Sequence, residues 1–220
     1  MTTRFAARWT VATLVALAAT GCGLQHPAVT PTYYTFDAAA KPPASVAPAP
    51  ASSSAPLPTL IVNPVHASAG FDSKRIIYQR EANKQEYFAY NEWVDTPARM
   101  LTPLLVGALE RNGAFRAVVQ TPSAAAGDLR LDLELVRLQQ DFTTTPSRVR
   151  LTLHAYVMDD TSRRVLAWRD IHVEAAAASD DPRGGVAAAN QAVRDALGQL
   201  AGFCAEAARG WRPAPDAKNR

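Results

Sequence analysis

The residue types that most often carry catalysis or bind metals are few in this chain, and their spacing does not gather them. The chain has four histidines, and no two of them have the i, i+4 spacing of a helical metal site. A hairpin centred near Thr161 would not place His154 opposite His172, because cross-strand partners lie equally far from the turn. We therefore expect exposed histidines on strands, no metal site and no cofactor; the histidines are His26, His66, His154 and His172.

The sequence also lacks the motifs around which common active sites are built. It contains no G-x-S-x-G, no H-E-x-x-H and no glycine-rich phosphate loop. Glu92 and Asp95 lie close together before an expected helix, where acids usually cap the helix and stabilise its dipole. Cys204 falls in the apolar stripe of the last expected helix, which favours a buried thiol over a nucleophile. These residues predict a protein that is not an enzyme.

Cys22 is the side chain for which the sequence predicts a definite modification. Arg4 and Arg8 precede a short apolar run at 11–20, which is too short to span about 30 Å of hydrocarbon and is typical of a signal peptide. The run leads into A-T-G-C at 19–22, which resembles a bacterial lipobox, in which the cysteine is acylated, palmitate being one such chain. The alternative is an ordinary secretory signal followed by an incidental cysteine.

The residue after Cys22 bears on the membrane that would hold the protein. Gly23 stands there instead of Asp, and this resembles the sorting pattern of outer-membrane lipoproteins in Gram-negative bacteria. A multiply acylated cysteine is a firm anchor, because each buried CH₂ contributes about 0.8 kcal/mol. We expect a lipoprotein anchored through Cys22 at the periplasmic face of the outer membrane.

Composition divides the chain into a domain and flanking segments. Hydrophobic residues make up 48% and charged residues 20%, so a core can form, whereas six of the 16 prolines fall between 42 and 58. Without Arg4 and Arg8, 21 basic side chains face 20 acidic ones, which gives no electrostatic case for nucleic acid. The expected parts are a signal peptide (1–21), a lipidated tether (22–32), a first strand (33–36), a Pro/Ala/Ser-rich linker or loop (37–58), the main domain (59–210) and a polar tail (211–220).

Strand and helix signals follow one another through the domain. Apolar and aromatic runs predict strands at 59–65, 74–80 and 85–93. Thr96-Pro97 then offers a helix start and Asn112-Gly113 a stop. Pro103 lies inside the helical pattern, so the helix either begins properly at Thr102-Pro103 or is kinked there.

The second half of the domain has the clearest periodicity. Leucines at every second position predict a half-buried strand from 128 to 138, and similar strands follow at 149–157 and 164–174. A second helix begins at Asp181-Pro182. Three consecutive strands predict an antiparallel meander whose apolar face both helices cover. The expected fold is α+β, a two-layer sandwich with a mostly antiparallel sheet and two helices on one face. The expected stripe of the second helix comprises Val186, Val193, Leu197, Leu200, Cys204 and Ala207.

Several short patterns, taken in order, resemble the ABC-type transport auxiliary lipoprotein component family, which includes lipoproteins like paraquat-inducible protein C. After the lipobox they are YYTF at 33–36, IVNPV at 61–65, FDSK at 71–74, Arg80 and Trp93. The alternating leucines, the hairpin strands and the last helix then follow the layout of the family. The likeness covers roughly Tyr33 to Ala208, apart from the proline-rich insert.

The resemblance implies a function that the residues alone do not. It implies an outer-membrane-anchored adaptor that works with an ABC transporter whose substrate-binding subunit carries a mammalian-cell-entry (MCE) domain, in moving lipids between membranes. The alternative is a structural or assembly-assisting outer-membrane lipoprotein without cargo. Composition and periodicity by themselves indicate a tethered α+β interaction domain.

The aromatic strand at 85–93 is where we expect a partner to bind. Its aromatic side chains occupy both alternating positions, so they cannot all lie on one side of a sheet. We expect either Phe88 and Tyr90 or Tyr87 and Trp93 to remain accessible to a protein partner or to a second copy of the chain. The alternative is that neighbouring loops cover both faces. The candidate interface comprises Asp72, Arg80, Tyr87, Phe88, Tyr90 and Trp93.

Two tether lengths are compatible with the sequence. If 33–36 docks as a strand, the 11 steps from Cys22 to Tyr33 reach at most about 40 Å. If it is loose, the tether runs to Thr59 and extends beyond about 110 Å at roughly 3.1 Å per residue. We expect docking, because large side chains would otherwise stay in water, and we expect deletion of 39–56 to leave folding nearly intact.

Overall fold

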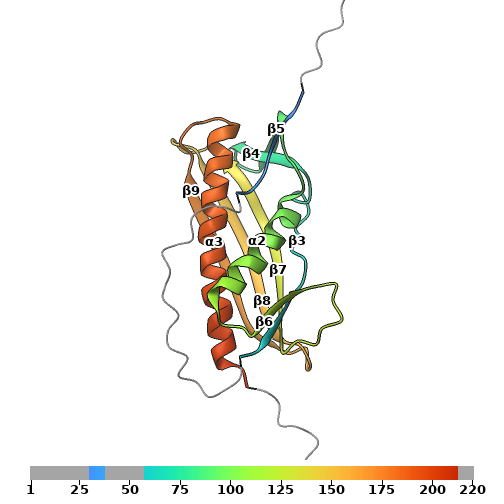
Figure 1. The fold of residues 1–220 in the computed structure, drawn as a ribbon. Coiled ribbons are helices and arrows are strands. Elements are labelled where there is room, and N and C mark those ends of the chain that lie inside the picture. Colours follow the sequence, from blue (N-terminus) through green and yellow to red (C-terminus); the bar gives the residue numbers. More distant parts are fainter. Residues whose placement is uncertain (1–29, 38–56, 213–220) are drawn as a thin grey trace, which may run out of the picture. The chain divides into compact units, whose positions relative to one another are not determined.

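The computed structural model describes residues 30–37 and 57–212, and the structural statements that follow concern these residues. The signal peptide, Cys22, the segment 38–56 and the tail 213–220 lie outside them. The elements are shown in Figure 1. The strands are β1 (Thr32–Tyr34), β2 (Thr59–Val62), β3 (His66–Ala67), β4 (Arg75–Glu81), β5 (Lys84–Trp93), β6 (Ala117–Gln120), β7 (Leu129–Asp141), β8 (Arg148–Asp159) and β9 (Val165–Ala176), and the helices are α2 (Pro97–Asn112) and α3 (Pro182–Gly210).

The sheet is organised around β7, which is paired along both of its edges. One edge pairs antiparallel with β8, which in turn pairs with β9, so the predicted meander is confirmed. The other edge receives β2, β3 and β4 one after another, each parallel to β7. Outside these, β6 pairs with β2, β5 pairs with β4, and β1 pairs with β5.

The expectation of a mostly antiparallel sheet was wrong. Among the described residues, five of the eight strand pairs are parallel and three are antiparallel, so the nine-stranded sheet is mixed. The reason is that β2, β3 and β4 follow one another along a single edge of β7 and run in the same direction as β7. Side-chain alternation reports which face of a strand is buried and carries no information about strand direction.

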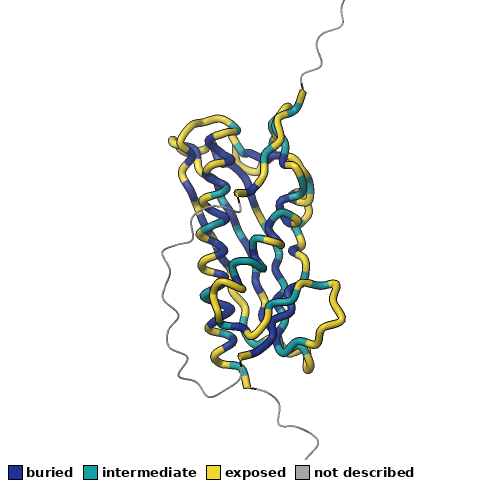
Figure 2. Tube along the Cα trace, viewed as in Figure 1, coloured by how far each residue is buried: buried dark blue, intermediate teal, exposed yellow. Residues whose placement is uncertain are grey.

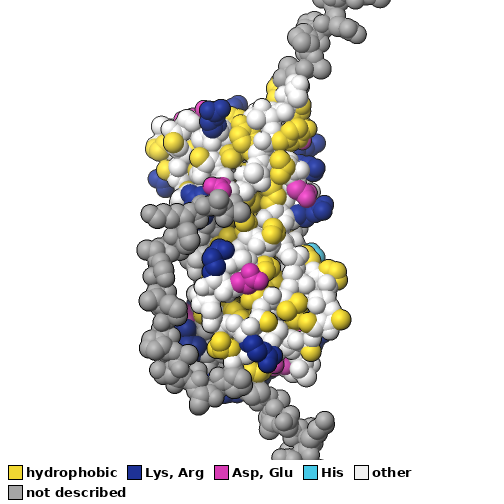
Figure 3. Space-filling view, viewed as in Figure 1, with side chains coloured by type: hydrophobic (Ala, Val, Ile, Leu, Met, Phe, Trp, Pro, Cys, Tyr) yellow, Lys and Arg dark blue, Asp and Glu magenta, His cyan; other side chains and the backbone are white. Residues whose placement is uncertain are grey.

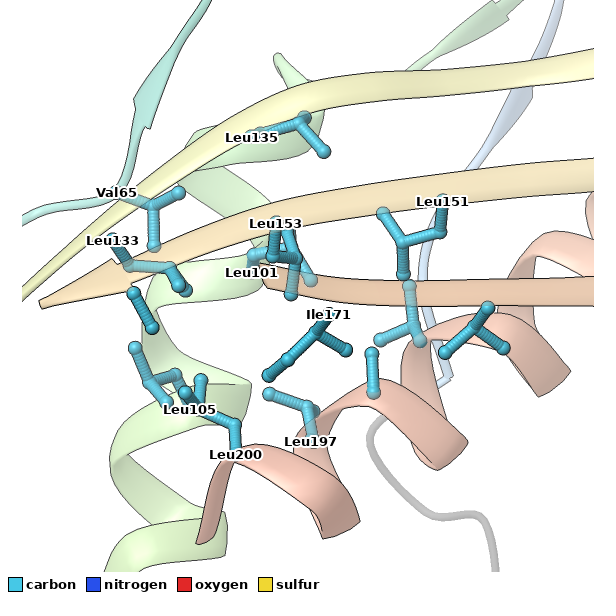
Figure 4. Close-up of a cluster of buried hydrophobic side chains, with 14 of the residues drawn as sticks. Val65, Leu101, Leu105, Leu133, Leu135, Leu151, Leu153, Ile171, Leu197 and Leu200 are labelled. Carbon is cyan, nitrogen blue, oxygen red and sulfur yellow. The ribbon is translucent and has the colours of Figure 1, made fainter. Parts of the chain in front are cut away.

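Both helices cover one face of the sheet, as predicted. α3 packs over β8 and β9, and α2 lies beside α3 over β3, β6 and β7 (Figure 1). Figure 2 shows buried residues along the strands behind the helices and exposed residues at the loops. In Figure 4, side chains from β7, β8 and β9 point at those of the two helices. The labelled core residues are Val65, Leu101, Leu105, Leu133, Leu135, Leu151, Leu153, Ile171, Leu197 and Leu200.

A β-bulge allows β7 to keep its apolar face over 13 residues. Leucines at odd positions from Leu129 to Leu135 are buried against the helices. The pairing with β8 then skips Val136, and the side of β7 toward the helices is occupied by Leu138 and Gln140 at even positions, while Gln139 and Asp141 are buried on the other side. One extra residue reverses the alternation, since side chains point to opposite faces in turn.

The ends of the helices are fixed by specific residues. α2 begins at Pro97 and continues through Pro103, so it does not begin at Thr102-Pro103. It ends where Gly113 adopts a left-handed backbone with φ of 72°. At the start of α3, the Gly184 N–H donates to Asp181 Oδ1 at 2.7 Å, which satisfies a free donor of the first turn.

The first strand is docked on the domain. β1 pairs with β5 in parallel, from Thr32 opposite Asn91 to Tyr34 opposite Trp93. Just after it, the buried Phe36 packs against Trp93, with ring centroids 5.0 Å apart. Of the two expected arrangements, the structure therefore has the one in which this strand is docked.

The docking of β1 sets a minimum length for 38–56. The Asp37 N–H donates to Asn190 Oδ1 at 2.6 Å, so Asp37 lies beside the third turn of α3. At the other end of the helix, Trp211 Nε1 donates to Asp159 Oδ2 at 3.3 Å, and Asp159 lies level with the start of β2. From Asn190 to Trp211 the helix rises about 31 Å. Deletion of 39–56 would leave only Ala38 between Asp37 and Leu57, and one residue cannot cover this distance. The geometry therefore argues against the expectation that this deletion leaves folding nearly intact.

Graded deletions test this connection. Removing 44–51 leaves 11 residues between Asp37 and Leu57, a reach of about 40 Å, and should change the free energy of unfolding by less than about 0.5 kcal/mol. Removing 39–56 should undock Phe36 and cost about 3 kcal/mol or more. Urea unfolding measures both; equal stability of the two deletion variants would contradict the geometry.

Candidate functional site

The sheet face turned away from the helices, here called the open face, carries polar side chains from β7, β8 and β9. His154 lies opposite Glu134 on β7 and Asp170 on β9. Its Nδ1 is 3.9 Å from Glu134 Oε2 and its Nε2 is 3.5 Å from Asp170 Oδ1. His172 faces Thr152, so the expectation that the two histidines are not paired is confirmed. In the described ranges, no group of three or more His, Cys, Asp or Glu could hold a metal ion.

Ion pairs join β7, β8 and β9 near the other end of this face. Arg150 Nη1 lies 2.9 Å from Asp141 Oδ2, and Arg150 Nε lies 3.1 Å from Glu174 Oε1. Asp141 Oδ1 also accepts hydrogen bonds from the N–H and the hydroxyl of Thr143, at 2.8 and 2.6 Å. Burial by itself would raise the pKa of the Asp141 carboxyl, but the Thr143 hydrogen bonds and the Arg150 charge outweigh it and lower the pKa below 3.8.

Three exposed tyrosines lie where β1 joins the sheet. Tyr33, Tyr87 and Tyr90 are 57%, 51% and 54% exposed. The register places Tyr33 and Arg75 on either side of Glu92, so all three share one face. The Arg75 guanidinium lies 4.1 Å from the centre of the Tyr87 ring, and the exposed Tyr90 lies between Tyr87 and Glu92 along β5. We call Tyr33, Tyr87 and Tyr90 the tyrosine face.

The accessible residues of the aromatic strand are not either of the expected pairs. Tyr87 and Tyr90 are exposed, Phe88 is half-buried, and Trp93 is 3% exposed in the core. The reason is an irregularity in the pairing, which steps from Arg75–Glu92 to Ile77–Tyr87 and so sets four residues of β5 against one of β4. This shift breaks the simple alternation on which the expectation rested, and Trp93 cannot contact a partner.

The other candidate interface residues lie near β4. Phe88 packs on Tyr78 with ring centroids 4.5 Å apart, and Phe142 completes this aromatic cluster. The exposed Arg80 places its guanidinium 4.9 Å from the Tyr78 ring centre. Asp72 is exposed in the loop before β4. Arg80 therefore covers the apolar cluster, and Asp72 does not belong to it.

A second exposed apolar surface lies on the hairpin of β8 and β9. Trp168 is 64% exposed and lies opposite Tyr156, which itself lies opposite Asp132 on β7. Val165 is exposed beside them. We call Tyr156, Val165 and Trp168 the tryptophan patch. The sequence analysis did not predict this patch. A signal was present, because Trp168 is at an even position whereas the apolar residues from Ile171 onward are at odd positions, which places Trp168 on the opposite face of the strand.

A shallow hollow of about 480 Å³ adjoins the tryptophan patch, between β9 and α3. Trp168 and Phe203 are among the residues that line it. The Arg169 guanidinium lies 4.8 Å from the Phe203 ring centre, and its Nη2 lies 3.0 Å from Glu206 Oε2. The hollow thus combines apolar walls with one ion pair, a mixture typical of protein-binding surfaces.

Cys204 is buried in α3, as predicted from its place in the stripe. Burial raises the pKa of its thiol to about 12, so the thiolate is scarce at neutral pH.

The comparisons with known proteins decide the family. The family model described as ABC-type transport auxiliary lipoprotein component matches residues 34–201. The chain belongs to this family. The match begins at the last residue of β1 and ends within α3. It contains β2 to β9, α2, the tryptophan patch, and Tyr87 and Tyr90 of the tyrosine face, whereas Tyr33 lies just before it.

Two solved structures have a fold similar to that of this chain. A protein from Xanthomonas campestris, assigned to DUF330, is 23% identical with a TM-score of 0.68; the match covers 81% of this chain and 97% of that one. An uncharacterised protein is 15% identical with a TM-score of 0.58, over 78% of this chain and 97% of the other. No curated protein matches the chain.

The surface of this auxiliary lipoprotein is mixed in charge on the side of the helices. Figure 3 shows acidic and basic side chains scattered over that face among hydrophobic ones. None of the described helices is long and apolar enough to cross a membrane.

The Asp141 cluster gives a pH-dependent prediction. Because the folded pKa of Asp141 is lowered, its charge contributes stability above pH 3.8, and this contribution is lost as the pH falls through the folded pKa. Asp141→Asn should therefore lower the free energy of unfolding by about 1–3 kcal/mol at pH 7, and by much less near pH 2.5. Asp72→Asn in an exposed loop is the control. Urea titrations at both pH values measure the difference; an effect of Asp141→Asn that is the same at both would contradict the assignment.

Proposed function

We propose that the chain is a lipid-anchored accessory of an ABC transport system that acts by binding and holds no catalytic site. Its family membership over 34–201 carries this proposal. In detail, Cys22 anchors it at the periplasmic face of the outer membrane, and the domain docks an MCE-domain subunit of a transporter that moves lipids between membranes. Gly23 after Cys22 supports the choice of membrane.

The docked first strand supports a short anchor. From Cys22 to Thr32 there are ten residue steps, which reach at most about 36 Å. A domain on such a tether stays close to its membrane. A partner that comes from the inner membrane therefore meets the parts of the domain that lie farther from β1.

The tryptophan patch fits that position. Tyr156 of the patch pairs with Asp132 of β7, whereas β4 pairs with β7 at Gln140. These two positions on β7 are eight residues apart, which corresponds to about 26 Å along the strand. From β1 to β9 the sheet also crosses five strand pairs, and a twist of roughly 20–25° at each turns the local face by on the order of 100°. The tyrosine face and the tryptophan patch therefore do not belong to one continuous flat surface.

Side-chain chemistry also favours the tryptophan patch as the partner surface. Exposed tryptophan beside a hollow is typical of residues that dominate binding energy at protein interfaces. We therefore propose that the MCE-domain subunit contacts Trp168, in place of the strand at 85–93 that the sequence had suggested. The structural lipoprotein without cargo is the alternative that the experiment must exclude.

A crosslinked pulldown from solubilised membranes tests the proposal. The tagged chain should recover an MCE-domain protein from the outer-membrane fraction, and Cys22→Ala should move the chain out of that fraction. Trp168→Ser should weaken capture by about 30-fold or more, which corresponds to the loss of a hot spot worth at least about 2 kcal/mol. Tyr90→Ser, at another exposed aromatic residue, should leave capture unchanged.

The outcomes separate the parts of the proposal. Absence of any MCE-domain protein would favour the structural lipoprotein. Equal capture by Trp168→Ser would contradict only the docking surface. Unchanged fractionation of Cys22→Ala would contradict the anchor.

A further inference from the structure

The tyrosine face has the composition of a membrane interface. Its three side chains come from two paired strands: Tyr33 from β1, and Tyr87 and Tyr90 from β5. Each exposes more than half of its surface. Tyrosine combines an apolar ring with a hydroxyl, and for this reason it is enriched where hydrocarbon meets lipid headgroups.

The two strands arrange these rings on the side away from the core. Tyr34 and Trp93 lie opposite each other in the register, and their side chains pack inward. Tyr33 and Glu92 are the preceding pair and so point outward. Tyr33 is therefore backed by the buried packing of Phe36 on Trp93, and it lies on the edge strand of the sheet.

The charge around the tyrosine face is balanced. β4 and β5 together carry three basic and three acidic side chains. A balanced surface gives no long-range attraction to an anionic bilayer, so contact would depend on the aromatic rings and on proximity. The six charged residues are Arg75, Arg80, Lys84, Glu81, Glu86 and Glu92.

The chain outside the domain supplies the proximity. Tyr33 follows Thr32 directly, and ten steps of chain separate Thr32 from Cys22, at most about 36 Å. If Cys22 is in the membrane, the headgroups are at high effective concentration for the tyrosine face, and a weak contact suffices to occupy it.

We propose that the tyrosine face is a membrane-contact surface that rests in the phospholipid headgroup region of the leaflet that holds Cys22. This rests on the proposed anchor at Cys22. The contact orients the domain, so that Trp168 is turned away from the bilayer and toward the periplasm.

Site-specific fluorescence on the acylated full chain tests the contact. The chain is reconstituted in vesicles of phosphatidylethanolamine and phosphatidylglycerol, with Tyr90→Cys labelled by an environment-sensitive dye. Cys22 is blocked by acylation and Cys204 is buried with a pKa of about 12, so neither takes the label. Trp168→Cys, labelled in the same way, is the matched control.

Lipids that carry a spin label near the headgroup should quench the dye at 90 several-fold more than the dye at 168. Adding Tyr33→Ser and Tyr87→Ser to the Tyr90→Cys chain should reduce this quenching, which shows that the tyrosines and not the dye make the contact. Equal quenching at 90 and 168 would overturn the proposal, as would quenching at 90 that the serine substitutions leave unchanged.

Flotation of the same vesicles measures the anchor separately. A chain that floats without selective quenching at 90 retains the proposed anchor and disproves the membrane contact. A chain that does not float disproves the anchor, and with it the proposal that depends on it.

Discussion

The pairing of β7 along both of its edges is the constraint on which the structure depends. Thirteen residues of β7 receive β8 on one side and β2, β3 and β4 in sequence on the other. Its leucines form part of the apolar sheet face on which α2 and α3 pack, and the bulge at Val136 keeps this apolar face continuous along the strand. Every other strand is attached directly or through one or two neighbours, so the placement of both exposed aromatic surfaces follows from β7.

This arrangement gives the domain two chemically different ends. Where β4, β5 and β1 join, exposed tyrosines lie next to the point at which the chain leaves toward Cys22. Where β8 and β9 meet, Trp168 and Tyr156 lie beside the hollow between β9 and α3. Five strand pairs separate β1 from β9, and a sheet twist of roughly 20–25° at each gives the two surfaces different directions. The proposed role as a tethered adaptor needs such a division, because one surface would face the membrane while another stays free for a partner.

The sequence predicted those elements whose signal is local. Leu129 to Leu135 alternate because one face of β7 is buried, and the stripe of α3 repeats at helical spacing for the same reason. It did not predict the parallel pairing of β2, β3 and β4, because strand direction depends on partners far away in the chain. Nor did it predict which aromatics of β5 are exposed, because an irregular pairing changed their parity. Cys22 lies outside the described residues, and its acylation stays a prediction.

Photocrosslinking in living cells from a photoreactive residue at position 168 tests the central claim most directly, since it reads direct contact at the far end of the anchored domain. We expect a covalent adduct with an MCE-domain subunit of a transporter, formed by the native chain and lost when Cys22→Ala releases it from the membrane. An adduct with lipid, or with a second copy of this chain alone, would contradict the claim that Trp168 faces a transporter subunit across the periplasm.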